Sequence, residues 1–160
     1  AVAVLDRTLV RVGNRRYAAD NESYGLTTLT CDHIAVEGRH VHLEFAGKGG
    51  AEHQLVFEDS RLSKLISQCQ ELGGQTLFSY PAPDGTMSSV SSSDVNGYLS
   101  DTLGGPFTAK DFRTWGASSL VVGELARSHG EDLPLEDRVR DAIDLAAERL
   151  GNTRAVCRAS

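Results

Sequence analysis

The chain has 160 residues, of which 40% are hydrophobic and 24% charged, which is typical of a globular protein and favours one domain over residues 1–160. It contains no run of 18 apolar residues, which excludes a membrane-spanning helix. Its three cysteines have the spacing of neither a disulfide framework nor a CxxC site, which favours a cytoplasmic setting. The net charge of −6 counts against attraction of the whole chain to nucleic acid, although four arginines cluster near the start: Arg7, Arg11, Arg15 and Arg16.

The first half of the chain predicts a helix followed by a small sheet. Apolar residues at helical spacing (Val2, Leu5, Leu9 and Val12) predict an opening helix with Arg7 and Arg11 on its polar side, and a polar loop over residues 14–24 follows. Alternating apolar and polar residues predict antiparallel strands over 33–37, 40–46 and 53–58. The glycine-rich turn between the second and third strands has Lys48 at its tip.

The second half of the chain is predicted to be helical. Ser60 is a candidate cap for a helix that ends near Glu71, and Ser91 and Thr108 each precede an aspartate by three residues, as in a capping box. After Pro134 an apolar stripe predicts a last helix: Val139, Ile143, Ala146 and Leu150. The fold class expected is therefore α+β, mainly helical with a small three-stranded antiparallel sheet.

Four polar residues that lie far apart in the sequence suit the binding of a phosphorane. The guanidinium groups of Arg11 and Arg113 offer fixed forks of donors to phosphate oxygens. When a phosphodiester is cleaved, a flexible lysine such as Lys48 can protonate the 5′ oxygen that departs. The side-chain amide of Asn152 can donate a hydrogen bond to a non-bridging oxygen of the phosphorane. Lys48 alone is an ordinary hairpin lysine, and Asn152 alone is an ordinary cap after Gly151 at a helix end. Arg113 has the weakest structural explanation, because the positive end of a helix does not favour a cation.

Other polar and aromatic residues give weaker signals. Four histidines fall on the predicted strands (His33, His40, His42 and His53), but their spacing is not that of a structural zinc site, so no metal is expected. Trp115, the single tryptophan, is expected in the core.

The motifs that carry these residues resemble the catalytic domain of type IB DNA topoisomerases of the small bacterial and poxvirus kind. The resemblance rests on RVG at Arg11 with Tyr17 shortly after, on GLTTL at residues 25–29, and on a lysine 37 residues after Arg11. It continues with KDFRTW at residues 110–115 and LGNT at residues 150–153, so that it covers essentially the whole chain. Arg154 stands where proline is common in the family.

The resemblance implies a fold, an activity and a set of functional residues. It implies the fold shared by type IB topoisomerases and tyrosine recombinases, and relaxation of supercoiled double-stranded DNA through a 3′-phosphotyrosyl intermediate, without ATP, metal or other cofactor. Arg11, Lys48, Arg113 and Asn152 would be catalytic, and Tyr17, Lys110 and Arg15 would contact DNA. The nucleophilic tyrosine is expected one residue beyond Ser160, because the family places it nine residues after the last motif. An N-terminal lobe, a monomeric state and a cytoplasmic, nucleoid-associated location are also expected.

Three alternatives remain open at this point. A tyrosine recombinase has the same pocket, but its usual HxxR motif differs from the KDFR of this chain. A DNA-binding module would keep the phosphate pocket without chemistry. An acidic protein-interaction domain would show no salt-dependent DNA binding.

Overall fold

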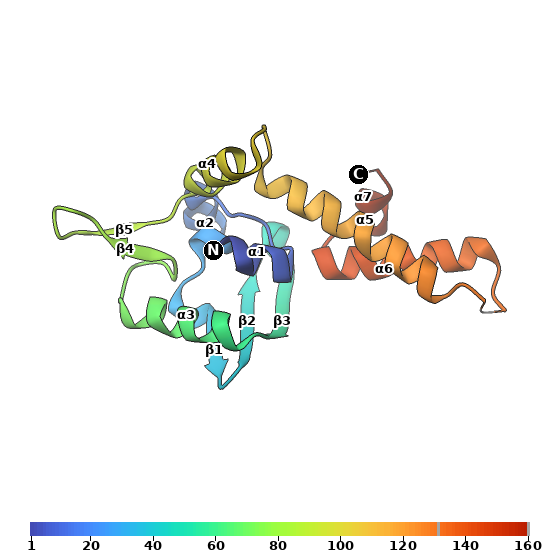
Figure 1. Ribbon diagram of the computed structural model, residues 1–160, viewed down its shortest axis with the longest axis horizontal. Coiled ribbons are helices and arrows are strands. Elements are labelled where there is room, and N and C mark those ends of the chain that lie inside the picture. Colours follow the sequence, from blue (N-terminus) through green and yellow to red (C-terminus); the bar gives the residue numbers. More distant parts are fainter. Residues whose placement is uncertain (131, 160) are drawn as a thin grey trace.

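A computed structural model of the chain describes residues 1–130 and 132–159. A body formed by the sheet and the first four helices is followed by a pair of long helices that extends away from it (Figure 1). The helices are α1 (Val2–Thr8), α2 (Arg15–Asn21), α3 (Ser60–Glu71), α4 (Ser92–Leu103), α5 (Ala109–Arg127), α6 (Leu135–Leu150) and α7 (Arg154–Ala159). The strands are β1 (Ile34–Glu37), β2 (His40–Ala46), β3 (Glu52–Glu58), β4 (Ser79–Pro81) and β5 (Met87–Ser89). The predicted α+β class is confirmed.

The main sheet is antiparallel in the order β1-β2-β3, and its strands begin and end within one residue of the predicted ranges. Successive side chains of a strand point to opposite faces, so Val41, Leu43 and Phe45 of β2 share the buried face. The register places Phe45 opposite His53 of β3, which puts this histidine on the buried face as well.

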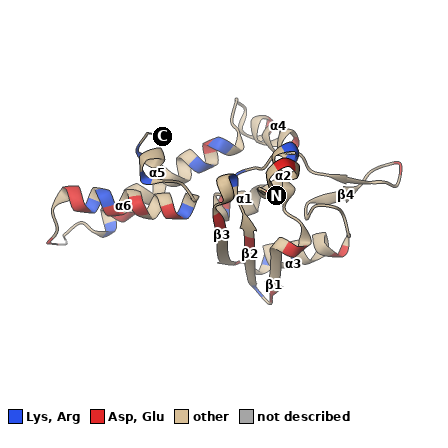
Figure 2. Cartoon of the chain, turned by 180° about the vertical axis from the view of Figure 1, so that it is seen from behind, with Lys and Arg blue, Asp and Glu red and all other residues tan. Residues whose placement is uncertain are grey.

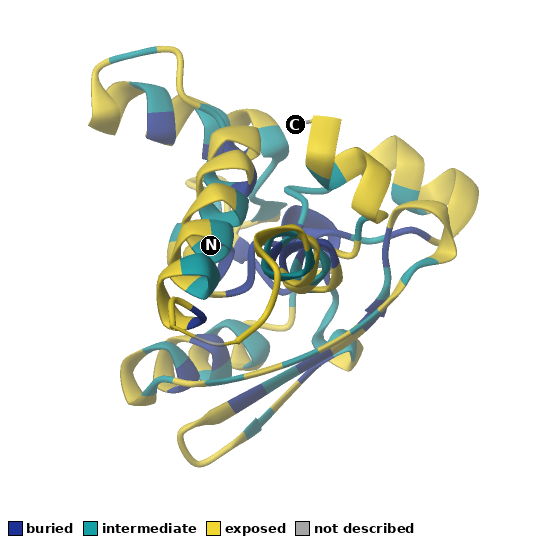
Figure 3. Cartoon of the chain, turned by 90° about the vertical axis from the view of Figure 1, so that its right-hand side faces the viewer, coloured by how far each residue is buried: buried dark blue, intermediate teal, exposed yellow. Residues whose placement is uncertain are grey.

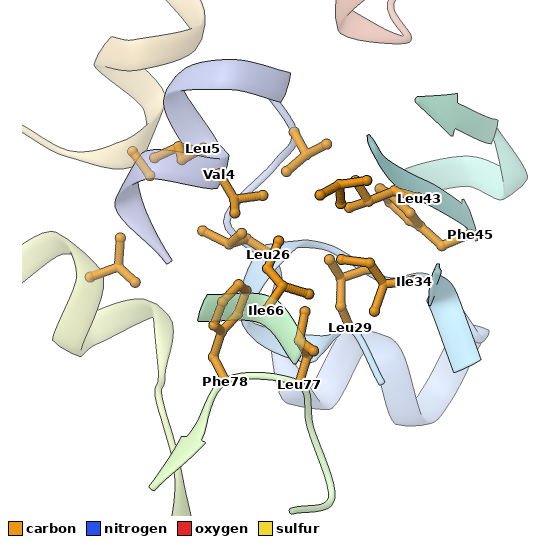
Figure 4. Close-up of a cluster of buried hydrophobic side chains, with 14 of the residues drawn as sticks. Val4, Leu5, Leu26, Leu29, Ile34, Leu43, Phe45, Ile66, Leu77 and Phe78 are labelled. Carbon is orange, nitrogen blue, oxygen red and sulfur yellow. The ribbon is translucent and has the colours of Figure 1, made fainter. Parts of the chain in front are cut away.

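A single cluster of buried side chains packs the sheet against α1, α3 and α4. Figure 4 shows how residues of the first helix, the loop after α2 and the segment after α3 meet over the strands. Leu5, Leu26 and Leu29 are fully buried there. Figure 3 shows these buried residues gathered where the elements meet, with the loops and the outer helix faces exposed.

The capping boxes at the starts of α4 and α5 form as predicted. The Asp94 carboxylate accepts from the amide of Ser91 at 2.8 Å, and the Asp111 carboxylate accepts from the amide of Thr108 at 2.7 Å. The predicted cap of α3 is wrong by one residue, because Asp59 rather than Ser60 accepts from the first free amides of that helix.

Two other expectations about local structure are wrong, and two features were not predicted. The opening helix ends at Thr8, where Leu9 adopts a left-handed backbone (φ 55°), so Arg11 lies in the segment after the helix and not on it. The segment predicted as a loop contains α2, because the Asn14 side chain caps it by accepting from the amides of Arg16 and Tyr17. The hairpin of β4 and β5 and the short helix α7 were not predicted.

Trp115 is not a core residue. It lies on α5 with 77% of its surface exposed, because α5 and α6 pack mainly against each other and leave much of α5 outside the body. Helix α6 carries alternating acidic and basic residues along its length (Figure 2). Among the described residues, none of the helices is both long enough and apolar enough to cross a membrane.

Candidate phosphate-binding site

Arg11 is positioned by backbone pairing with the GLTTL segment. The carbonyl of Arg11 accepts from the amide of Leu26 at 2.9 Å, and the carbonyl of Val12 accepts from Thr27 at 2.8 Å. Only glycine fits at residue 25, since a Cβ there would lie 2.6 Å from the Arg11 carbonyl oxygen. The two sequence motifs therefore form one structural unit that fixes the backbone of Arg11.

Arg113 is buried in the first turns of α5, with 9% of its surface exposed. Its Nη1 donates to the carbonyl of Leu9, and its Nη2 donates to the carbonyl of Leu150 at 2.8 Å. The end of α1 approaches α5 closely because Gly116 of α5 leaves room for the Leu9 side chain. A Cβ added at Gly116 would lie 2.6 Å from Leu9 Cδ1. Arg113 thus joins the ends of α1 and α6 to α5.

The charge of Arg113 is retained despite its burial. Loss of water, and next the positive charge of Arg11, lower the pKa of Arg113 to about 10. That value lies well above neutral pH, so the site keeps two guanidinium charges close together. Such a pair favours an anion between or beside them, because each cation is otherwise repelled by the other.

Asn152 lies directly beside both guanidinium groups. It follows Gly151, whose left-handed backbone (φ 59°) ends α6. The Oδ1 atom of Asn152 accepts from Arg11 Nη2 at 2.8 Å and lies 3.5 Å from Arg113 Nη2. A guanidinium can only donate, so the amide oxygen must face the arginines and the amide NH₂ is left to donate elsewhere.

Two adjoining hollows meet at these residues. One, of about 380 Å³, lies beside the turn that carries Lys48 and is lined by Arg11, Arg113 and Lys110. The other, of about 530 Å³, is lined by the same two arginines, by Lys110 and by Asn152. The structure therefore brings together all four residues singled out as catalytic, with exposed Lys48 and partly buried Asn152 on either side of the arginines.

The residues expected to contact DNA divide into two groups. Tyr17 and Lys110 line the hollow beside Lys48, where both are exposed. Arg15 does not line either hollow, and its Nη2 instead donates to the Ser89 carbonyl at 3.2 Å. Arg154 lies outside them as well and pairs with Asp144.

Two residues near the site were not singled out by sequence reasoning. Tyr24 lines the hollow with Lys48. The ring of His53 packs against Gly47 and Gly151, the residues that precede Lys48 and Asn152. The sequence signal for His53 is its position on the same strand face as Leu55 and Phe57, which indicates that its side chain points toward the body of the protein. Over the described ranges, the structure contains no group of three or more His, Cys, Asp or Glu residues placed to hold a metal ion.

This α+β fold gathers two arginines, a lysine and an asparagine at two adjoining hollows, an arrangement that suits the binding of a phosphate group. The family model described as eukaryotic DNA topoisomerase I, catalytic core, matches residues 1–160, and the chain belongs to that family. It is 29% identical over 160 residues to the DNA topoisomerase 1B of Acanthamoeba polyphaga mimivirus, covering 94% of this chain and 48% of that protein.

A second relative is the DNA topoisomerase 1 of Mycosarcoma maydis, which is 27% identical over 145 residues. The match covers 79% of this chain and 14% of that protein. The chain thus spans about half the length of the mimivirus relative and a small part of the fungal one.

Proposed function

We propose that the chain is the catalytic core of a type IB DNA topoisomerase, which relaxes supercoiled double-stranded DNA by cleaving and resealing one strand. The observation that carries the proposal is the hydrogen bond from Arg11 to Asn152 beside buried Arg113. It gathers two guanidinium groups and one amide at a point where the two hollows meet. Family membership supports the same conclusion.

The arrangement supports a role for each residue in transesterification. Arg113 uses two of its N–H donors on backbone carbonyls and a third on Asn152, and keeps the remaining two for phosphate oxygens. Arg11 and Asn152 donate to the non-bridging oxygens of the phosphorane, whose charge exceeds that of the ground state. Lys48 donates a proton to the 5′ oxygen as it departs, and Lys110 adds positive charge beside it.

A tyrosine nine residues after Asn152 is the proposed nucleophile. The tyrosine hydroxyl loses its proton to water as its oxygen attacks phosphorus, the bond to the 5′ oxygen breaks, and the 3′ phosphate remains on the tyrosine. Religation is the reverse reaction, in which the 5′ hydroxyl attacks and returns its proton to Lys48. Because the phosphodiester energy is kept in the covalent bond, no ATP is required. The charges of Arg11, Arg113 and Lys48 serve the phosphorane in place of a metal ion.

Double-stranded DNA is the proposed partner, held by a monomer together with an N-terminal lobe. Tyr17 and Lys110 would contact DNA in the hollow beside Lys48. Arg15 would contact it outside the hollows, beside the β4–β5 hairpin. We assign the enzyme to the small bacterial and poxvirus kind, on the basis of the motifs that carry Arg11, Lys48 and Arg113 and their spacing, and to the cytoplasm, with the nucleoid. The net negative charge of the chain does not prevent DNA binding at the cationic site. Acidic residues more than about 10 Å from the DNA phosphates are screened by salt, so they repel the DNA only weakly.

Plasmid relaxation by the complete gene product tests the proposal. We expect relaxation in EDTA without ATP, with intermediate topoisomers visible at early times, and loss of relaxation in the Arg113→Ala variant. A requirement for magnesium or ATP would refute the proposed chemistry. Exchange of strands between two specific sites, without relaxation, would assign the pocket to a recombinase instead.

A further inference from the structure

The ring of His53 lies between the two turns that carry Lys48 and Asn152. A Cβ at Gly47 would lie 2.6 Å from His53 Cδ2 and Nε2, and a Cβ at Gly151 would lie 2.5 Å from Cε1. These separations are shorter than real Cβ contacts, so the imidazole touches the backbone of both turns. Glycine is required at both positions because the ring fills the space that a side chain would take.

The ring is itself held in place from behind by the sheet. His53 is the register partner of Phe45, and the two rings are stacked with centroids 4.9 Å apart and an interplanar angle of 16°. Phe45 belongs to the core and is 4% exposed. The hydrogen bonds found among residues 1–130 and 132–159 do not include the His53 ring, so packing fixes it.

The charges around His53 favour a neutral ring. Burial, and then the positive charges of Arg113 and Arg11, lower the pKa of His53, whereas Glu52 raises it. The lowered pKa favours the neutral imidazole, which adds no cation to those already present. A spacer of this kind suits a site whose own positive charges must remain available to phosphate.

We propose that His53 is a positioning residue of the phosphate site, because its ring holds the Lys48 turn at a fixed separation from the Asn152 turn. The inference rests on the proposed function and deepens it. Lys48 is otherwise exposed at the tip of a hairpin, where a general acid would be poorly placed. A misplacement of about 1 Å is enough to slow a reaction by up to about a hundredfold.

Amide hydrogen exchange tests the positioning itself, without any need for activity. The Gly47 amide donates to Ala51 at 2.7 Å and the Asn152 amide donates to Ala147 at 2.9 Å, so both report on the closure of their turns. In His53→Ala we expect both amides to exchange about tenfold faster. The matched control is His42→Ala, on the neighbouring strand and the opposite face, which should leave both unchanged. Unchanged exchange in His53→Ala would overturn the proposal.

Cleavage by the complete gene product tests the consequence for Lys48. Single-turnover cleavage by His53→Ala should be about tenfold slower or more, with DNA affinity within about threefold of wild type. On a substrate with sulfur as the 5′ bridging atom the loss should shrink below about threefold, because a thiol of pKa about 8.5 leaves without a proton donor. An equal loss on both substrates would mean that His53 does not act through Lys48.

A second variant approaches the same contact from the other side. Gly47→Ala places a methyl group against the ring without requiring a left-handed backbone, and we expect it to slow cleavage about tenfold. In the His53→Ala background the same change should slow cleavage less than about threefold, since the ring it would strike is gone. Additive losses would overturn the proposal. Gly123→Ala, in open space on α5, is the control. The two claims can fail separately. If the wild-type protein forms no covalent adduct with DNA, the proposed function is refuted, but hydrogen exchange in His53→Ala still tests whether this ring holds the two turns.

Discussion

Replacement of Arg113 by lysine separates the structural role of this residue from its charge. The guanidinium satisfies the carbonyls of Leu9 and Leu150 with two different nitrogens, whereas a single ammonium on a shorter side chain can reach only one. The variant therefore loses one buried, charge-assisted hydrogen bond, which stabilises a protein by about 1.5–3 kcal/mol. At roughly 2–4 °C per kcal/mol for a protein of this size, we expect the melting temperature to fall by about 3–12 °C.

The same replacement also removes the fork of donors from the phosphorane. Loss of one donor aimed at developing charge slows a reaction by about 10²–10³, so we expect Arg113→Lys to slow single-turnover cleavage by at least that factor. The assay is the rate of covalent adduct formation on a suicide DNA substrate, measured below the melting temperature of each variant. Cleavage within about threefold of wild type would refute the reasoning.

Arg149 provides the matched control for this experiment. It also donates from Nη2 to a backbone carbonyl across the fold, that of Arg7 at 3.0 Å, but the bond is exposed. Arg149→Lys should therefore change stability by less than about 0.5 kcal/mol and leave cleavage unchanged. An equal loss of stability in both variants would show that burial of the Arg113 contacts is not what matters.

Asn152→Asp keeps an acceptor for Arg11 but removes the amide donor and adds a negative charge, and we expect adduct formation to slow at least about a hundredfold. Thr108 lowers the pKa of Asp111 below its ordinary value of 3.8, so the unfolded chain takes up the proton first and this stabilisation is lost as the pH falls. As the pH is lowered below about 4, the melting temperature of Asp111→Asn should therefore fall less than that of the wild-type protein. Trp115→Ala should change the free energy of unfolding in urea by less than about 0.5 kcal/mol, and a larger loss would contradict the exposure of this side chain.

Sequence patterns predicted the strands and helix starts that depend on residues close together in the sequence. The strands of the main sheet were found because alternation along each strand records which face is buried. The starts of α4 and α5 were found because Ser91 and Thr108 make capping boxes within one turn. The cap at Asn14 has an equally local cause, and it was missed because the polar composition after it suggested a loop.

Long-range contacts explain the remaining errors. Leu9 ends α1 in a left-handed conformation, and it contacts Gly116 and Arg113, which both lie on α5, 104 or more positions further along the chain. Trp115 was expected in the core because large aromatic residues are usually buried, but α5 leaves the body.

In the candidate site, too, the contacts between residues far apart in the sequence could not be predicted from local patterns. Arg11 and Asn152 meet across 141 positions of sequence, a proximity that no periodicity records and that only the family resemblance suggested. His53 was missed because its contacts are with two glycines, which give no chemical signal in the sequence.

The measurement that tests the central claim most directly is identification of the residue that becomes joined to DNA. The complete gene product would be mixed in EDTA with a suicide duplex, and the adduct would be digested and sequenced by mass spectrometry. We predict a 3′ phosphate on the tyrosine nine residues after Asn152, still formed in Tyr17→Phe, because the Tyr17 hydroxyl is not the nucleophile, and not formed in Arg113→Ala. An adduct on Tyr17, or no adduct with wild-type protein, would contradict the assignment of this chain as the catalytic core of a type IB topoisomerase.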